Sequence, residues 1–272
     1  MIFEELALFI SQRYVQYGLI GGVLLAVAAA LLGQYLVFKG YSNLSDGIAH
    51  IALIGVLGGV LFDTFSLPIT VSITVVLACG LEWMRNTKII KAETAITLFV
   101  IFSLSFVSIA QNIIGFSRSL ESILFGSILT LQPHTLFIIG GLTGLVITYV
   151  SWNYRALLNI SFSEELAKTS GIRVTLHNYT IVALTAALIV MGIDIIGALL
   201  VGSLTILPVA TAQQLRLGFK QTHILSVSCA VLAVCFGLLI SWFAATPVGA
   251  SIALVSIMFF GLALVTRFFF KL

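Results

Sequence analysis

Two ionisable residues, Asp46 and His50, lie four positions apart at the start of the apolar run 45–53. In a helix, side chains at this spacing share one face. The pair offers a carboxylate oxygen and an imidazole nitrogen, and borderline divalent metals accept both ligands. The same residues also have a purely structural interpretation, in which Asp46 caps a helix N-terminus and His50 bonds to a neighbouring carbonyl.

The composition places this pair in a membrane. The chain has 272 residues, of which 60% are hydrophobic and 8% are charged, and its mean hydropathy is +1.18. Because soluble domains carry about 25% charged residues, we expect an all-α, polytopic bundle of transmembrane helices that forms one domain over residues 1–272. A charge at the centre of a lipid-spanning helix costs at least about 2.5 kcal/mol, so it is tolerated where it faces a protein interior or a polar path.

The composition also excludes several kinds of site and partner. The net charge of +3 is scattered along the chain, so no nucleic-acid surface is indicated. Cys79, Cys229 and Cys235 have no paired spacing, which argues against a disulfide framework or a cysteine-based zinc site. The N-terminal residues lack a basic region, so no cleavable targeting peptide is expected. No Gly-Lys pair occurs, so a Walker-type phosphate loop is absent and any ATP must be bound by another chain.

Nine segments are apolar and long enough to cross a bilayer at about 20 residues per crossing. They are expected at residues 14–38, 44–62, 66–84, 94–114, 134–152, 177–193, 195–213, 221–243 and 247–267. The segment 117–131 is too short to cross and is expected to be an interfacial or re-entrant helix. Because this segment is where a miscount would arise, the expected number of spans is eight or nine.

The basic residues set the orientation of the bundle. A cytoplasmic C-terminus places 11 of the 13 Lys and Arg residues on the cytoplasmic face and leaves only Arg13 and Arg118 outside. The positive-inside rule favours that arrangement. We therefore expect the N-terminus outside and the C-terminus inside.

The longest cytoplasmic stretch is expected to contain a short amphipathic helix within residues 161–174. Ser161 or Ser163 can cap this helix, Glu164 and Glu165 complement its N-terminus, and Gly171 can end it. Such a helix would lie parallel to the membrane with room to dock against a partner. A solvated connector without a docking role is the alternative.

Residues 36–50, Leu-Val-Phe-Lys-Gly-Tyr-Ser-Asn-Leu-Ser-Asp-Gly-Ile-Ala-His, resemble the signature of bacterial zinc/manganese ABC-importer permeases. In that signature a basic residue, a Ser and a Gly/Ser-Asp-x-x-x-His element lead into the second span. Further stretches similar to the same family follow in the same order at residues 93–96, 124–128, 164–171, 197–212 and 246–251. The resemblance therefore covers essentially the whole chain.

The resemblance implies a permease with the fold of type II ABC importers, in a bacterial cell membrane. Such a permease forms a homodimer, receives a divalent metal from an extracytoplasmic metal-binding protein and is driven by a cytoplasmic ATP-binding subunit. It is not itself an enzyme and holds no permanent cofactor, since Zn²⁺ or Mn²⁺ is its cargo. By the same resemblance, Asp46 and His50 contact the metal. The residues that correspond to the element gripped by the ATPase are Glu164, Glu165, Leu166, Ala167 and Gly171.

The choice of metal stays between zinc and manganese. Some zinc-type relatives carry a His early in the fourth span, where residues 98–105 of this chain have none. The stretches 197–212 and 246–251 resemble zinc-type members more closely, which favours zinc, with manganese second. Asp194 interrupts an apolar run near the expected outer surface, where it either lines an entrance or forms a turn.

Two other classes of protein also place polar groups inside a membrane. The alternative function is a secondary transporter or channel for a divalent cation. An intramembrane metalloprotease would need a His-Glu-x-x-His element, and the chain contains none.

Overall fold

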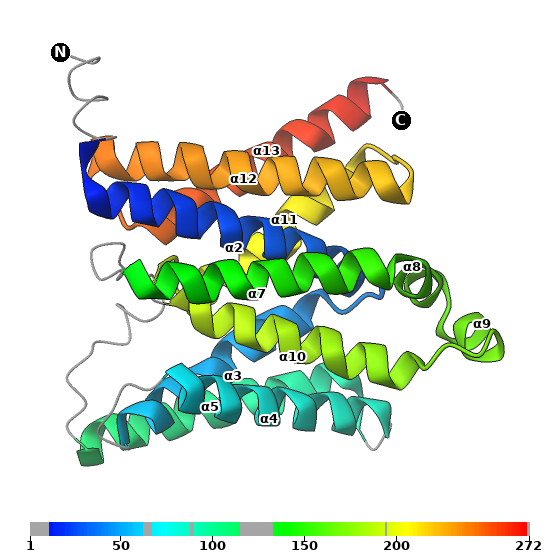
Figure 1. The fold of residues 1–272 in the computed structure, drawn as a ribbon, viewed down its shortest axis with the longest axis horizontal. Helices are drawn as coiled ribbons and strands as arrows, with labels where there is room; N and C mark the ends of the chain where they lie inside the picture. The colour runs from blue at the N-terminus through cyan, green and yellow to red at the C-terminus, as the bar shows by residue number, and fades with distance from the viewer. Residues whose placement is uncertain (1–10, 62–66, 88–89, 115–132, 194, 271–272) are drawn as a thin grey trace.

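The computed structural model describes residues 11–61, 67–87, 90–114, 133–193 and 195–270 (Figure 1). In these residues the regular structure is helical, which confirms the predicted all-α class. The nine long helices are α2 (Arg13–Phe38), α3 (Ser42–Leu61), α4 (Leu67–Asn86), α5 (Ala92–Ile114), α7 (Pro133–Trp152), α10 (Val174–Ile193), α11 (Ala198–Gln214), α12 (Phe219–Ala244) and α13 (Val248–Phe270). Two short helices, α8 (Tyr154–Phe162) and α9 (Glu164–Thr169), connect α7 to α10.

Each long helix coincides with one of the nine predicted spans. Among the described residues, seven of them have the length and mean hydropathy needed to cross a membrane. At 17 residues α11 is about 25 Å long, shorter than the roughly 30 Å hydrocarbon core. The first turns of α3 are rich in polar residues. The predicted interfacial or re-entrant segment 117–131 and Asp194 lie outside the described residues.

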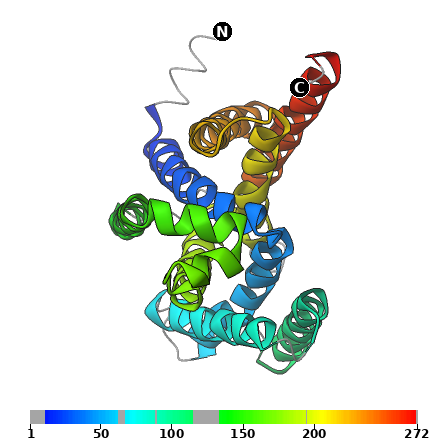
Figure 2. The same cartoon turned by 90° about the vertical axis from the view of Figure 1, so that its right-hand side faces the viewer.

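The long helices form three groups when the bundle is viewed from the end that carries α8 and α9 (Figure 2). α12 and α13 lie at one edge, and α4 and α5 lie at the opposite edge. Between them, α2 packs on α11 and α12, while α10 packs on α4 and α3. α3 therefore has protein neighbours along much of its length, because it also packs on α4, α5 and α11.

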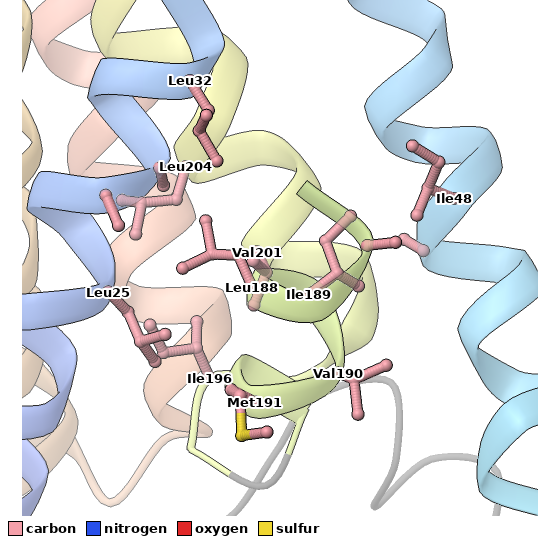
Figure 3. Close-up of a cluster of buried hydrophobic side chains, with 14 of the residues drawn as sticks. Leu25, Leu32, Ile48, Leu188, Ile189, Val190, Met191, Ile196, Val201 and Leu204 are labelled. Atoms are coloured by element: carbon pink, nitrogen blue, oxygen red, sulfur yellow. The ribbon is translucent and has the colours of Figure 1, made fainter. Parts of the chain in front are cut away.

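Buried aliphatic side chains hold α3 against this central group. Figure 3 shows Ile48 of α3 pointing toward α10, where Ile189 is part of the same cluster as Leu25 and Leu32 of α2. These four side chains are fully buried. Ile48 lies two residues after Asp46, so the face of α3 that binds the core is distinct from the face that carries Asp46.

Backbone contact between helices replaces side-chain packing at Gly33. A Cβ atom added there would clash with the carbonyl oxygen of Thr205 on α11. Within a bilayer, association of helices depends on such close approaches, because lipid tails are as apolar as the side chains. Gly33 thus fixes α11 against α2.

The basic residues gather at the end of the bundle that carries α8 and α9, on the right in Figure 1. Among the described residues, this end holds Lys39, Arg85, Lys91, Arg155, Lys168, Arg173, Arg216, Lys220 and Arg267. Arg13 lies at the opposite end, where α2 begins. This distribution agrees with a cytoplasmic location for α8 and α9.

Candidate functional site

Asp46 and His50 lie on one face of α3, within an unbroken helix. Asp46 is exposed in the single chain, and His50 is half-buried. The Nδ1 atom of His50 is buried and has no hydrogen-bond partner among the described residues. Because α3 begins at Ser42, Asp46 is not the residue that caps this helix. The geometry therefore favours the ligand interpretation of the pair over the structural one.

Close neighbours on two sides position this part of α3. A Cβ atom added to Gly202 of α11 would lie 3.7 Å from the Cα atom of Asp46, so the two backbones nearly touch. On the other side, a Cβ atom added to Gly47 would lie 2.9 Å from a methyl group of Ile96 on α5. The backbone that carries Asp46 is thus held between α11 and α5.

As a metal site, the pair alone would supply only part of a coordination shell. Within the part of the chain that the structure describes, no group of three or more His, Cys, Asp and Glu side chains is placed to hold a metal ion. Zinc in proteins usually has four ligands. If the pair held a metal, one chain would offer one carboxylate and one imidazole, and the other positions would have to come from water or from a second molecule.

The structure shows where the helix predicted within 161–174 begins and ends. Ser161 remains inside α8, where its hydroxyl donates to the carbonyl oxygen of Leu157. Ser163 adopts an extended conformation that interrupts the helix, and its Oγ caps α9 by accepting from the Leu166 N–H at 3.3 Å. Gly171 follows α9 with φ +79°, a conformation that favours glycine. The short helix predicted within these residues is therefore α9, with Ser163 as its cap and Gly171 just after its end, and α8 is an additional helix before it.

The predicted coupling residues of α9 point in different directions. Ala167 is buried against Ile160 and Val174, so it anchors α9 to the chain. Glu165 is exposed, and Leu166 is 69% exposed. Phe162, just before α9, is 70% exposed. α9 and the last residue of α8 therefore present an apolar and acidic surface, made of Phe162, Glu165 and Leu166, at the end of the bundle where the basic residues gather.

Glu164 points into the protein instead. Its Oε1 atom lies 2.6 Å from the Nζ atom of Lys39, which directly follows α2. The same oxygen accepts hydrogen bonds from the side chains of Asn178 on α10 and Tyr41, each at 3.2 Å. Lys39 also donates to the Oδ1 atom of Asn178 at 2.5 Å. One carboxylate oxygen therefore joins α9 to α10 and to the connection between α2 and α3.

Lys39 of this ionic cluster is buried and Glu164 is partly buried. The Lys39 side chain is 5% exposed and that of Glu164 is 31% exposed. Burial lowers the pKa of Lys39, and Glu164 opposes this shift. Burial acts to raise the pKa of Glu164, but the hydrogen bond and charge of Lys39 hold it below its ordinary value. Burial also raises the pKa of Tyr41 to about 12, so its hydroxyl stays protonated and can donate to Glu164.

A second ion pair stands beside the first. Arg85 donates to the Oε1 atom of Glu82 on the same helix, α4, at 2.6 Å, and both side chains are buried. The Cζ atom of Arg85 lies 3.5 Å from the ring centroid of Tyr41, a cation–π contact. Tyr41 thus connects the two ion pairs.

Comparison with known proteins assigns the chain to a family. Residues 11–267 match the ABC 3 transport family. The chain belongs to this family. The predicted resemblance to metal-ion ABC-importer permeases is thereby confirmed.

Relatives of this ABC 3 family chain carry names for two different metals. It is 28% identical over 241 residues to the high-affinity zinc uptake system membrane protein ZnuB of Buchnera aphidicola subsp. Acyrthosiphon pisum (strain APS), which covers 88% of this chain and 92% of ZnuB. It is 30% identical over 252 residues to the manganese import system permease protein ScaB of Streptococcus parasanguinis, covering 91% and 89%. Among solved structures, PsaBC from Streptococcus pneumoniae in complex with Fab has a TM-score of 0.85 at 27% identity and covers 97% of this chain and 95% of that one.

Sequence reasoning missed the ionic cluster of this ABC 3 family chain. Glu82 and Arg85 carried a usable signal, because opposite charges three residues apart at the end of an apolar helix commonly pair. The contact of Lys39 with Glu164 had no such signal. Lys39 and Glu164 meet only because α9 and α10 pack beside the α2–α3 connection.

Proposed function

We propose that this chain is the membrane-spanning permease subunit of an ATP-driven importer of divalent transition metal ions, zinc or manganese. The observation that carries the proposal is the Asp46–His50 pair on one face of α3, with an unpartnered imidazole nitrogen, in a chain of the ABC 3 transport family. An oxygen and a nitrogen ligand suit both metals. The names of the relatives divide between the same two metals.

The proposed importer contains two copies of this chain. Each copy supplies two ligands, and Asp46 is exposed in the single chain. A two-fold axis beside α3 would bring two carboxylates and two imidazoles to one ion, and two-fold dimers are the commonest symmetric assemblies. A site made of few protein ligands also suits transport, because the ion must bind and then leave.

Two further proteins complete the proposed importer. A cytoplasmic ATP-binding subunit is needed because this chain has no Walker-type loop. It would dock on the surface formed by Phe162, Glu165 and Leu166. Ala167 would hold α9 against its neighbours in the chain, and Gly171 would provide the turn that follows α9. An extracytoplasmic metal-binding protein would deliver the ion at the opposite end of the bundle. All three components would work at a bacterial cell membrane.

Reconstitution in liposomes tests the proposed function. The permease, its ATP-binding subunit and its metal-binding protein are expected to accumulate zinc or manganese only when ATP is supplied, and parallel assays with each ion identify the cargo. Magnesium serves as the control ion, since it demands six oxygen ligands and keeps its waters. Accumulation at the same rate without ATP would instead establish a secondary transporter or channel.

The docking surface on α9 leads to a separate prediction. Leu166→Asp combined with Glu165→Lys is expected to reduce copurification of the ATP-binding subunit at least tenfold, because it removes an exposed apolar contact and reverses a neighbouring charge. Pull-down from detergent extracts measures this loss. Leu217→Asp, an apolar-to-acidic change at the same end between α11 and α12, is the control and should copurify normally. Unchanged copurification of the α9 variant would exclude this surface.

A further inference from the structure

α9 is attached to the bundle in two different ways. One side of α9 packs in a small apolar cluster. In this cluster Ala167 contacts Ile160 and Val174, which are close to it in sequence. Glu164 makes a different connection, because its Oε1 atom contacts Lys39 and Tyr41 from the connection between α2 and α3. The first attachment holds α9 to its own neighbours in the chain, and the second reaches a part of the bundle that is remote in sequence.

The α2–α3 connection is tied tightly to both of its helices. The Tyr41 N–H donates to the carbonyl oxygen of Leu36 at 2.8 Å, and the Tyr41 carbonyl oxygen accepts from the Leu44 N–H at 3.0 Å. Asp46 follows Tyr41 by five residues, which is about 7 Å along a helix axis. A displacement of Tyr41 or Lys39 therefore acts directly on the first turns of α3.

Stability alone does not explain the Lys39–Glu164 pair. Desolvation of two buried charges offsets most of their attraction, and replacing such a pair with apolar side chains is often neutral or stabilising. The pair instead contributes a defined geometry. Lys39 donates both to Glu164 and to Asn178, and Asn178 donates to Glu164. A closed set of this kind fixes the position of α9 relative to α10 and to the start of α3.

We propose that the Lys39–Glu164 pair, with Asn178 and Tyr41, is the link that transmits a displacement of α9 to the first turns of α3, and so to Asp46 and His50. This inference rests on the proposed function, because α9 is displaced only if an ATP-binding subunit docks there. Glu164, Lys39, Asn178 and Tyr41 are positioning residues in this scheme. They act on the metal ligands through the backbone of α3.

The test measures metal transported per ATP hydrolysed in the reconstituted importer. Lys39→Met and Glu164→Gln are each expected to lower this ratio tenfold or more, while the ATP-binding subunit still copurifies and still hydrolyses ATP. Lys220→Met makes the same change at an exposed lysine of the same end and should keep the wild-type ratio. A merely structural role would reduce the yield of folded complex but leave the ratio unchanged.

The double variant Lys39→Met/Glu164→Gln keeps the test decisive if a single variant does not fold. It leaves no buried charge without a partner, so it should assemble, and its ratio should be as low as that of either single variant. A wild-type ratio in the double variant overturns the link. If the wild-type complex accumulates neither zinc nor manganese with ATP, the proposed function fails; if it does and the variants match it, only the link fails.

Discussion

Asp46→Ala and His50→Ala are each expected to reduce metal uptake by the reconstituted importer at least about a hundredfold, since even residues that only support metal ligands contribute 10- to 100-fold. In a two-fold dimer, one substitution removes two of the four protein ligands. Asp46 is exposed, and the Nδ1 atom of His50 has no hydrogen-bond partner among the described residues, so we expect both variants to fold. Uptake of zinc and of manganese measures the effect.

Assembly is the control for this prediction. The ATP-binding subunit should copurify with both variants in wild-type amounts, because the α9 surface is unchanged. His134→Ala, which removes an exposed histidine at the start of α7, should transport normally. Normal uptake by a well-expressed Asp46→Ala or His50→Ala variant would falsify the assignment of the pair as the metal site.

The second large effect is expected when cysteines introduced at the two ends of the bundle are labelled. The contrast between the two positions should be all-or-none, and it reports the orientation of the bundle. Ser170 and Thr246 are both exposed, and they lie at opposite ends of the helices. Thr246→Cys is expected to react with an impermeant thiol reagent in intact cells, whereas Ser170→Cys should react only after the membrane is opened. The positive-inside rule, which places the end rich in Lys and Arg in the cytoplasm, is the physical reason.

The native thiols must not contribute to this readout. Cys79, Cys229 and Cys235 are partly buried and unpaired, so they are first replaced with Ala or Ser. Labelling of Ser170→Cys in intact cells would reverse the topology. It would also remove the possibility that a cytoplasmic ATPase docks on α9.

Much of the fold could be predicted because a bilayer imposes a length and a polarity on each span. The nine predicted spans correspond to the nine long helices. Ends were less accurate: α10 begins at Val174 rather than at residue 177. The choice between two caps was left open, because Ser161 and Ser163 are equally good caps in sequence. Their roles are separated by backbone conformation, which is extended at Ser163 and helical at Ser161.

The candidate site could be predicted only where it is local. Asp46 and His50 share a helix face by their spacing alone. Tyr41 and Glu164 are separated by 123 residues, and their contact follows from how α9 and α10 return to the end of α2. A second missing element is the rest of the coordination shell, since the spacing of two residues in one chain carries no information about a symmetric copy.

The two ion pairs at the end of the bundle that carries α8 and α9 have an electrical consequence. Lys39 and Arg85 carry two positive charges, and Glu82 and Glu164 carry two negative ones. An unbalanced charge that crossed the whole membrane would change the energy by about 2.3 kcal/mol for every 100 mV of potential. Because these four charges sum to zero, moving the two ion pairs together by the same distance along the membrane normal does no net electrical work on them. Membrane voltage therefore favours neither position of this group.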